Sequence, residues 1–169
     1  AAVADRILIT KTDIASYEAI AKLKQRLAEI NPQAVVGDVV QGEIDPAQLT
    51  GIGLARVRAG GGDVARWLGP LPAAAGSLMG GASHTTGVRS FCLWFDRPFT
   101  WDAFEACIQV LTSLRGNDLL RVKGLVNVEG KAGPVVIQGV QHVFHPPVTL
   151  DSWGGEDHRT RIVFITRGI

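Results

Sequence analysis

Cysteine is scarce in this chain of 169 residues, which contains only Cys92 and Cys107. Two cysteines without a CxxC pair make neither a disulfide framework nor a structural metal site, so we interpret both as free thiols in a reducing compartment. Long hydrophobic runs are also lacking, since no apolar stretch approaches the roughly 18 residues of a membrane helix. The N-terminus lacks the basic and then apolar layout of a signal peptide. These absences predict a cytoplasmic protein without a membrane partner.

An excess of one charge sign is missing as well. The chain has 17 Lys and Arg residues against 16 Asp and Glu residues. Residues 1–83 carry eight of each sign, and residues 84–169 carry nine basic and eight acidic side chains. Nucleic-acid-binding modules usually show a strong basic excess or stripe, so we exclude a nucleic-acid partner. A hydrophobic content of 46% with 20% charged residues is typical of an ordinary folded domain.

The first 50 residues contain two apolar runs with one amphipathic run between them. The runs at 4–9 and 34–40 are short and rich in β-branched residues, as strands are. Between them, apolar residues recur at the three- and four-residue spacing of a helix face: Ile20, Leu23, Leu27 and Ile30. The pattern ends at Asn31-Pro32, and the β-α-β order predicts a parallel strand pair. Asp45-Pro46 predicts the start of a further short helix, and residues 63–68 another helical turn.

The second half is dominated by strand-like patterns. One helical pattern runs from Asp102 to Leu114 and ends at Gly116-Asn117, and strand-like runs occur at 88–95, 120–129, 134–144 and 161–166. Apolar and polar residues alternate in the run 120–129. This alternation predicts one buried face and one solvent-exposed face, the latter carrying Arg121 and Lys123. We expect an α+β domain with a mostly antiparallel sheet and a packed helix.

Glycine, proline and alanine gather between the two halves of the chain. Residues 70–83 contain little that could be buried, which is typical of a linker. We therefore divide the chain into a first part over 1–69, a linker over 70–83 and an α+β domain over 84–169.

Four polar residues, Thr10-Lys11-Thr12-Asp13, follow the first predicted strand, at the strand end where open α/β sheets bind ligands. They resemble the NKxD base-recognition element of GTPases, with Thr in the place of Asn. In that element the carboxylate accepts hydrogen bonds from guanine N1–H and the 2-amino group, and the Lys stem lies along the base. The resemblance assigns Thr10, Lys11 and Asp13 to guanine-nucleotide binding. The alternative is a polar loop that only caps the next helix.

Longer motifs occur in the second half in a fixed order: the runs 84–90 (HTTGVRS), 120–124 (LRVKG) and 136–142 (VIQGVQH), then Trp153 and the run 161–165. They resemble the C-terminal domain of the CobW family, metal-related P-loop GTPases that include cobalamin-biosynthesis proteins and zinc chaperones. The resemblance covers nearly the whole chain. It implies an α/β remnant over 1–69, the end of a P-loop GTPase domain, followed by a CobW C-terminal-like domain over 84–169.

The catalytic motifs of such GTPases are missing from these 169 residues. There is no GxxGxGK(S/T) phosphate loop and no CxCC metal motif, and Gly60-Gly61-Gly62 is followed by Asp63, whose charge would repel phosphate. We expect the chain to be the C-terminal portion of a longer protein and not catalytic alone, with no cofactor of its own. For the full-length protein the resemblance implies GTPase activity, with GTP and Mg²⁺ and a divalent metal, zinc or cobalt.

The histidines invite a metal interpretation, because imidazole is a common zinc ligand. Among the four, only His142 and His145 lie close together, and in a continuous strand their odd separation places them on opposite faces. They are the candidate metal ligands, but a His pair without Cys or carboxylate partners is a poor zinc site, so we favour ordinary surface histidines. A second acidic set near Trp153 is explained equally well by a solvated loop: Asp151, Glu156, Asp157 and His158.

Two functional hypotheses follow. In the first, the chain belongs to a CobW-like GTP-binding protein for metal insertion or trafficking, and its C-terminal domain docks a partner or regulates. The implied partners are a guanine nucleotide, a metal-receiving client protein and a second copy of the chain. In the alternative, the chain is a stand-alone protein-interaction module with no nucleotide chemistry. Sequence upstream of Ala1 separates the two, since a phosphate loop and a CxCC motif belong to the first and a nearby initiator Met to the second.

Overall fold

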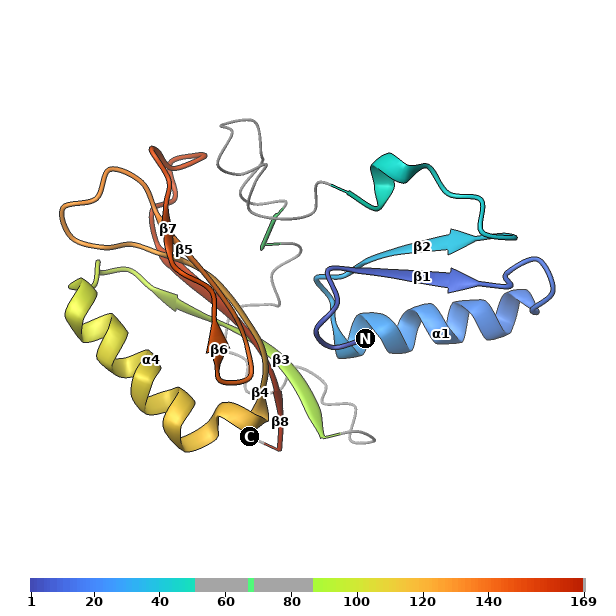
Figure 1. Ribbon diagram of the computed structural model, residues 1–169, viewed down its shortest axis with the longest axis horizontal. Coiled ribbons are helices and arrows are strands. Elements are labelled where there is room, and N and C mark those ends of the chain that lie inside the picture. Colours follow the sequence, from blue (N-terminus) through green and yellow to red (C-terminus); the bar gives the residue numbers. More distant parts are fainter. Residues whose placement is uncertain (51–66, 69–86, 169) are drawn as a thin grey trace. The chain divides into compact units, whose positions relative to one another are not determined.

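The computed structural model describes residues 1–50, 67–68 and 87–168, and the chain divides into two compact units, Ala1–Pro70 and Leu71–Ile169 (Figure 1). We call them the N-terminal and the C-terminal unit. The predicted linker at 70–83 lies outside the described residues, so the assignment of domains at 1–69 and 84–169 stays a prediction. Of the turn predicted at 63–68, only Trp67 and Leu68 are described, and both are helical. No described helix is long and apolar enough to cross a membrane.

The N-terminal unit contains the predicted β-α-β arrangement. Strand β1 (Arg6–Thr10) pairs in parallel with β2 (Val35–Val39), and helix α1 (Tyr17–Ile30) connects them. The parallel pair is therefore confirmed. An ion pair of 2.6 Å between Lys24 Nζ and Asp38 Oδ2 joins the helix to β2. The short helix η1 (Pro46–Gln48) begins as predicted, with the Asp45 carboxylate accepting a hydrogen bond from the Ala47 N–H at 2.9 Å.

Buried amide side chains fix the end of α1. The backbone N–H of Asn31 donates to the carbonyl of Leu27, and its side chain is 1% exposed. The amide nitrogen of that side chain lies 2.8–3.1 Å from three carbonyl oxygens, those of Ala1, Ala2 and Ala4. Its oxygen accepts from the N–H of Gln33, whose own amide donates to the carbonyl of Leu68. Asn31 and Gln33 thus join three segments that are distant in sequence.

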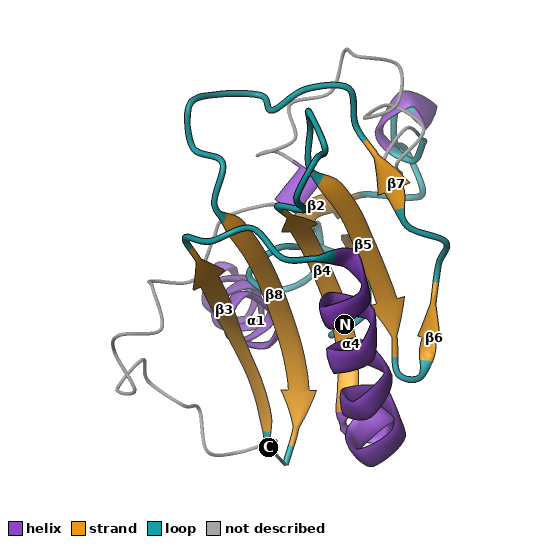
Figure 2. Ribbon diagram, turned by 90° about the vertical axis from the view of Figure 1, so that its left-hand side faces the viewer, coloured by secondary structure: helices purple, strands orange, loops and turns teal. Residues whose placement is uncertain are grey.

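The C-terminal unit is an antiparallel sheet with one helix on it. Helix α4 (Trp101–Arg115) crosses one face (Figure 2). The strand order is β3-β8-β4-β5-β6, and β7 pairs with β5. The strands are β3 (Val88–Phe95), β4 (Leu119–Val126), β5 (Val135–Val140), β6 (Val143–Phe144), β7 (Val148–Thr149) and β8 (Thr160–Arg167). Every pairing among them is antiparallel. The predicted α+β class of this unit is confirmed.

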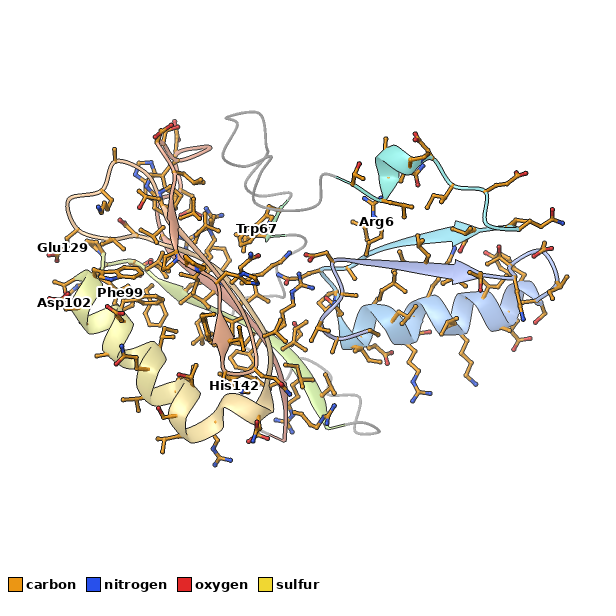
Figure 3. The ribbon with its side chains drawn as sticks, viewed as in Figure 1. Arg6, Trp67, Phe99, Asp102, Glu129 and His142 are labelled. Atoms are coloured by element: carbon orange, nitrogen blue, oxygen red, sulfur yellow. The ribbon has the colours of Figure 1, made fainter. Side chains whose placement is uncertain are left out.

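The core of the C-terminal unit lies between α4 and the sheet. Its buried side chains come from the helix and the central strands: Phe104, Leu119, Val122, Val126, Val128, Val135, Ile137, Ile162 and Phe164. Gly124 faces this core, and a Cβ there would stand 3.0 Å from Ile137 and 3.1 Å from Ile162. Phe99 lies opposite Val128: its N–H donates to the carbonyl of Asn127, and its carbonyl accepts from the N–H of Glu129. The ring of Phe99 lies 5.7 Å from that of Phe104 (Figure 3). These contacts hold the start of α4 against the sheet.

The prediction that Arg121 and Lys123 face solvent is wrong. All eight residues of β4 are buried, and these two are each 5% exposed. The face opposite α4 also buries Leu125, Val136 and Val163. Strand β4 is a central strand, paired with β5 on one side and β8 on the other, and both of its faces are covered. Alternation shows which side chains share a face, but long basic side chains with apolar stems can occupy a covered face as well as an open one.

The single strand predicted at 134–144 is also wrong. Strand β5 ends at Val140, and the chain turns back so that Val140 pairs with Val143 of β6. Gln141 takes the left-handed conformation at φ 54° in this turn, and His142 follows it there. A turn without glycine, proline or asparagine gives little signal in the sequence, which explains why the pattern suggested one continuous strand.

Gly116 ends α4, although not in the way that a terminal glycine usually does. Its φ of −52° is right-handed, and the chain continues into the short helix η2 (Gly116–Asp118). A Cβ at Gly116 would stand 3.1 Å from the Cβ of His142 in the β5–β6 turn. The glycine is therefore required for close approach of the turn and not for a positive φ.

We predict that amide protons of Leu120–Val128 exchange more slowly in the native state than those of Ile7–Ile9. The first segment includes most of a strand with a neighbour on each side, whereas β1 has one paired neighbour among the described strands. Native-state hydrogen exchange read by mass spectrometry or NMR measures the difference. Equal or reversed protection would contradict this ranking of the two units.

Candidate functional site

The four residues Thr10-Lys11-Thr12-Asp13 form an ordered loop at the carboxyl end of β1 (Figure 1). Thr10 is the last residue of the strand, and Lys11 takes a left-handed conformation with φ 61°. The carbonyl of Lys11 accepts hydrogen bonds from the N–H groups of Ile14 and Ala15, at 3.3 and 3.2 Å. The side chains of Thr10, Lys11 and Asp13 are all exposed. The structure thus brings the predicted base-recognition residues together on one solvent-facing loop.

The start of α1 is capped by another residue. The hydroxyl oxygen of Ser16 accepts a hydrogen bond from the N–H of Ala19 at 3.3 Å, and Ser16 has the extended backbone of an N-cap. Within the described residues, no hydrogen bond or ion pair engages the carboxylate of Asp13. The alternative in which Asp13 itself caps the helix is therefore disfavoured. Its carboxylate remains available to accept hydrogen bonds from a ligand.

The conformation of Lys11 adds a second sign of function at this loop. A left-handed conformation costs a residue with a side chain roughly 1 kcal/mol or more, and such residues gather at ligand-binding sites. Two further non-glycine residues of the described chain share it, Gln41 and Gln141, and both lie in turns. Lys11 instead lies between a parallel strand and its crossover helix, the position where α/β sheets bind ligands.

The predicted metal ligands are not gathered into a cluster. His142 lies in the β5–β6 turn (Figure 3), and His145 follows β6, where its N–H donates to the carbonyl of Gln138. Both side chains are exposed. Within residues 1–50, 67–68 and 87–168, no group of three His, Cys, Asp or Glu side chains could hold a metal ion. His158, from the acidic set, stacks on Trp153 at 5.1 Å between ring centroids.

A cluster of Arg and Trp around Asp157 was not anticipated from the sequence. The Asp157 carboxylate receives two hydrogen bonds of 3.0 Å from the guanidinium of Arg159, and its carbonyl accepts one from Arg161. Both guanidinium groups lie over the ring of Trp94, at 4.7 and 5.6 Å from its centroid. Trp94 and Arg161 are directly paired across β3 and β8. The strand register was the missing signal, since 94 and 161 are far apart in sequence.

The hydrogen bonds between Arg159 and Asp157 shift the pKa of both groups. Hydrogen bonding from Arg159 is the main cause that lowers the pKa of Asp157 from 3.8 to about 2, and the same bond raises the pKa of Arg159. Because Asp157 already binds two arginines and His158 stacks on Trp153, the acidic loop has a structural role. The solvated-loop interpretation of this set is thus favoured over a metal site.

The two cysteines are free thiols in very different surroundings. Cys92 is fully buried, and burial raises the pKa of its thiol from 9.0 to about 11. Such a thiol is inert, because the thiolate is the nucleophile. Cys107 lies exposed on α4.

Residues 88–169 match the cobalamin synthesis protein CobW C-terminal domain. The matched residues span the antiparallel sheet from β3 to β8 together with helix α4. Over 162 residues the chain is 31% identical to the zinc chaperone YjiA of Escherichia coli (strain K12). The aligned region covers 96% of this chain and 47% of that protein. The resemblance to the C-terminal portion of a CobW-like GTPase is thus confirmed.

Two solved structures have a similar fold. The Zn(II)-bound YjiA GTPase from E. coli matches with a TM-score of 0.65 and 26% identity, covering 99% of this chain and 49% of that one. A Zn(II)-bound triple mutant of the YjiA GTPase matches with a TM-score of 0.64 and 27% identity, covering 98% and 48%. The chain spans about half the length of these relatives.

We predict that Asp157→Asn weakens the C-terminal unit near neutral pH by about 1 kcal/mol, a modest effect because the carboxylate is 39% exposed and solvent screens the pair. The folded-state pKa is depressed, so the stabilisation is present above pH 3.8 and is lost as the pH falls toward about 2. Urea unfolding followed by tryptophan fluorescence should therefore show a difference in the free energy of unfolding between wild type and variant at pH 7. This difference should shrink as the pH falls from 3.8 toward about 2.

The matched control is Asp102→Asn, which removes an exposed carboxylate from the first turn of α4. This variant measures the effect of losing one carboxylate outside the cluster around Asp157. A difference between wild type and Asp157→Asn that stays constant from pH 7 to pH 2 would show that the ion pair with Arg159 contributes nothing.

Proposed function

We propose that this chain is part of a CobW-like GTP-binding protein that delivers a metal to a client protein, and that Thr10, Lys11 and Asp13 read guanine. The observation that carries the proposal is the loop after β1, where an unengaged carboxylate and a left-handed lysine follow a parallel strand. The similarity to a zinc chaperone favours zinc as the metal. Cobalt for cobalamin synthesis is a second candidate, supported by the CobW domain at 88–169.

Guanine selection follows from the chemistry of a carboxylate. The two oxygens of Asp13 accept hydrogen bonds only, and guanine presents two neighbouring donors, N1–H and the 2-amino group. Adenine lacks this pair, so it leaves the carboxylate unmatched. The stem of Lys11 covers the face of the base, while Thr10 carries a shorter polar group than the Asn usual at that position. The phosphates and Mg²⁺ are bound by motifs outside these 169 residues.

The C-terminal unit serves as the docking or regulatory part in this proposal. Its central strand β4 is buried on both faces, whereas the outer side of α4 presents Val110 and Leu114, which are 59% and 75% exposed. A rigid sheet that presents an exposed helix suits a docking module better than a catalytic one.

We predict that Asp13→Asn in the full-length protein shifts nucleotide preference from GTP toward XTP. The mutant amide turns a donor toward the 2-amino group of guanine, which costs on the order of 1–3 kcal/mol for unmatched polar groups. Xanthine has a carbonyl at that ring position and therefore matches the amide. Titration of both nucleotides by calorimetry measures the change, which should be about tenfold or more in their ratio.

Three comparison variants sharpen this experiment. Glu18→Gln makes the same chemical change on an exposed carboxylate of α1 and should leave the ratio unchanged. Lys11→Ala should weaken both nucleotides without changing their order. Lys11→Gly should also weaken both, yet it should stabilise the fold, since glycine accepts φ 61° without cost. If Asp13→Asn leaves the ratio of affinities unchanged, Asp13 does not read the base.

A further inference from the structure

Helix α4 carries a second apolar stripe that does not face the sheet. The inner stripe, with Phe104, Ile108 and Leu111, packs against the core. The outer stripe consists of four exposed residues: Ala103, Cys107, Val110 and Leu114. Val110 and Leu114 are 59% and 75% exposed, which is unusual for large apolar side chains.

The spacing of the outer stripe matches a helical partner. Its members follow one another at steps of four, three and four residues, which is the a/d repeat along which two helices pack. A shallow depression of about 500 Å³ on this side of the helix is lined by Ala106, Cys107, Val110, Leu111, Leu114 and Arg115. The small side chains at positions 103, 106 and 107 allow another helix to approach closely.

The charges at the ends of α4 suit a partner that runs in the opposite direction. Asp102 lies in the first turn (Figure 3), and Arg115 lies in the last turn. The ion pair of Arg115 with Asp118 is 3.5 Å long and exposed, so it restrains the guanidinium only weakly. A second α4 in antiparallel orientation brings each acidic first turn to the level of a basic last turn, and the helix dipoles then also oppose each other.

We propose that two copies of this chain pair through the outer stripes of α4, antiparallel and related by a twofold axis between Cys107 and Val110. In this register Cys107 contacts the partner's Val110, and Ala103 contacts the partner's Leu114. A small side chain then meets a large one in the outer layers, so the stripe is complementary to itself in size as well as in charge. A twofold contact of this kind is closed and limits assembly to a dimer.

Disulfide cross-linking tests the register. Val110→Cys places a thiol opposite the partner's Cys107, within the roughly 4.4–6.8 Å between Cα atoms that a disulfide needs. Mild oxidation should therefore convert this variant to a covalent dimer faster than wild type, whose paired Cys107 residues stand further apart. Gln109→Cys, exposed on the other side of the helix, is the matched control and should not gain cross-linking. Cys92 is buried and does not compete.

Sedimentation equilibrium tests the association itself. Wild-type chain should show a monomer–dimer equilibrium at concentrations up to about 1 mM. Leu114→Glu should raise the dissociation constant of the dimer about tenfold or more. The change removes a leucine that the proposed contact buries and places a charge there. Gln109→Glu adds the same charge off the stripe and should leave the constant unchanged. A wild type that stays monomeric, or a dimer that both glutamate variants leave intact, overturns the proposal and assigns the stripe to a different partner.

Discussion

The burial of β4 on both faces is the constraint on which the C-terminal unit depends. The two neighbouring strands satisfy the backbone groups of β4, and its side chains are buried on both faces of the sheet. Gly124 removes bulk where Ile137 and Ile162 meet, and Gly139 lies so close to the ring of Phe144 that a Cβ would stand 2.9 Å away. Glycine at these two positions leaves room for the side chains that pack there.

Periodicity was enough to predict α1, α4 and most strands among the described residues. The spacing of Ile20, Leu23, Leu27 and Ile30 identified α1, and the bounds of β3 agree with the predicted run 88–95. It failed where the answer depended on distant residues. Arg121 and Lys123 alternate with apolar residues whether their face is open or covered, and nothing local marks Gln141 as a turn. Both errors concern which segments become neighbours, information that a local pattern does not contain.

Some features of the candidate site could likewise be predicted from the sequence, and others required the structure. The loop of Thr10, Lys11 and Asp13 could be predicted because all its members are adjacent in sequence and follow a recognisable strand. The left-handed conformation of Lys11 and the capping by Ser16 required the structure, since both depend on how the chain leaves β1. The cluster of Trp94, Arg161 and Asp157 could not be predicted at all, because it forms only when β3 and β8 pair in one particular register.

The contrast between the two thiols makes the wild-type chain selectively addressable by spectroscopy. Cys92 is covered and its pKa is raised to about 11, so a maleimide or methanethiosulfonate reagent at neutral pH modifies Cys107 alone. A nitroxide attached there reports on the surroundings of α4 without a cysteine-free background. The mobility of this nitroxide on the 169-residue chain then reports whether the outer side of α4 is open to solvent or covered.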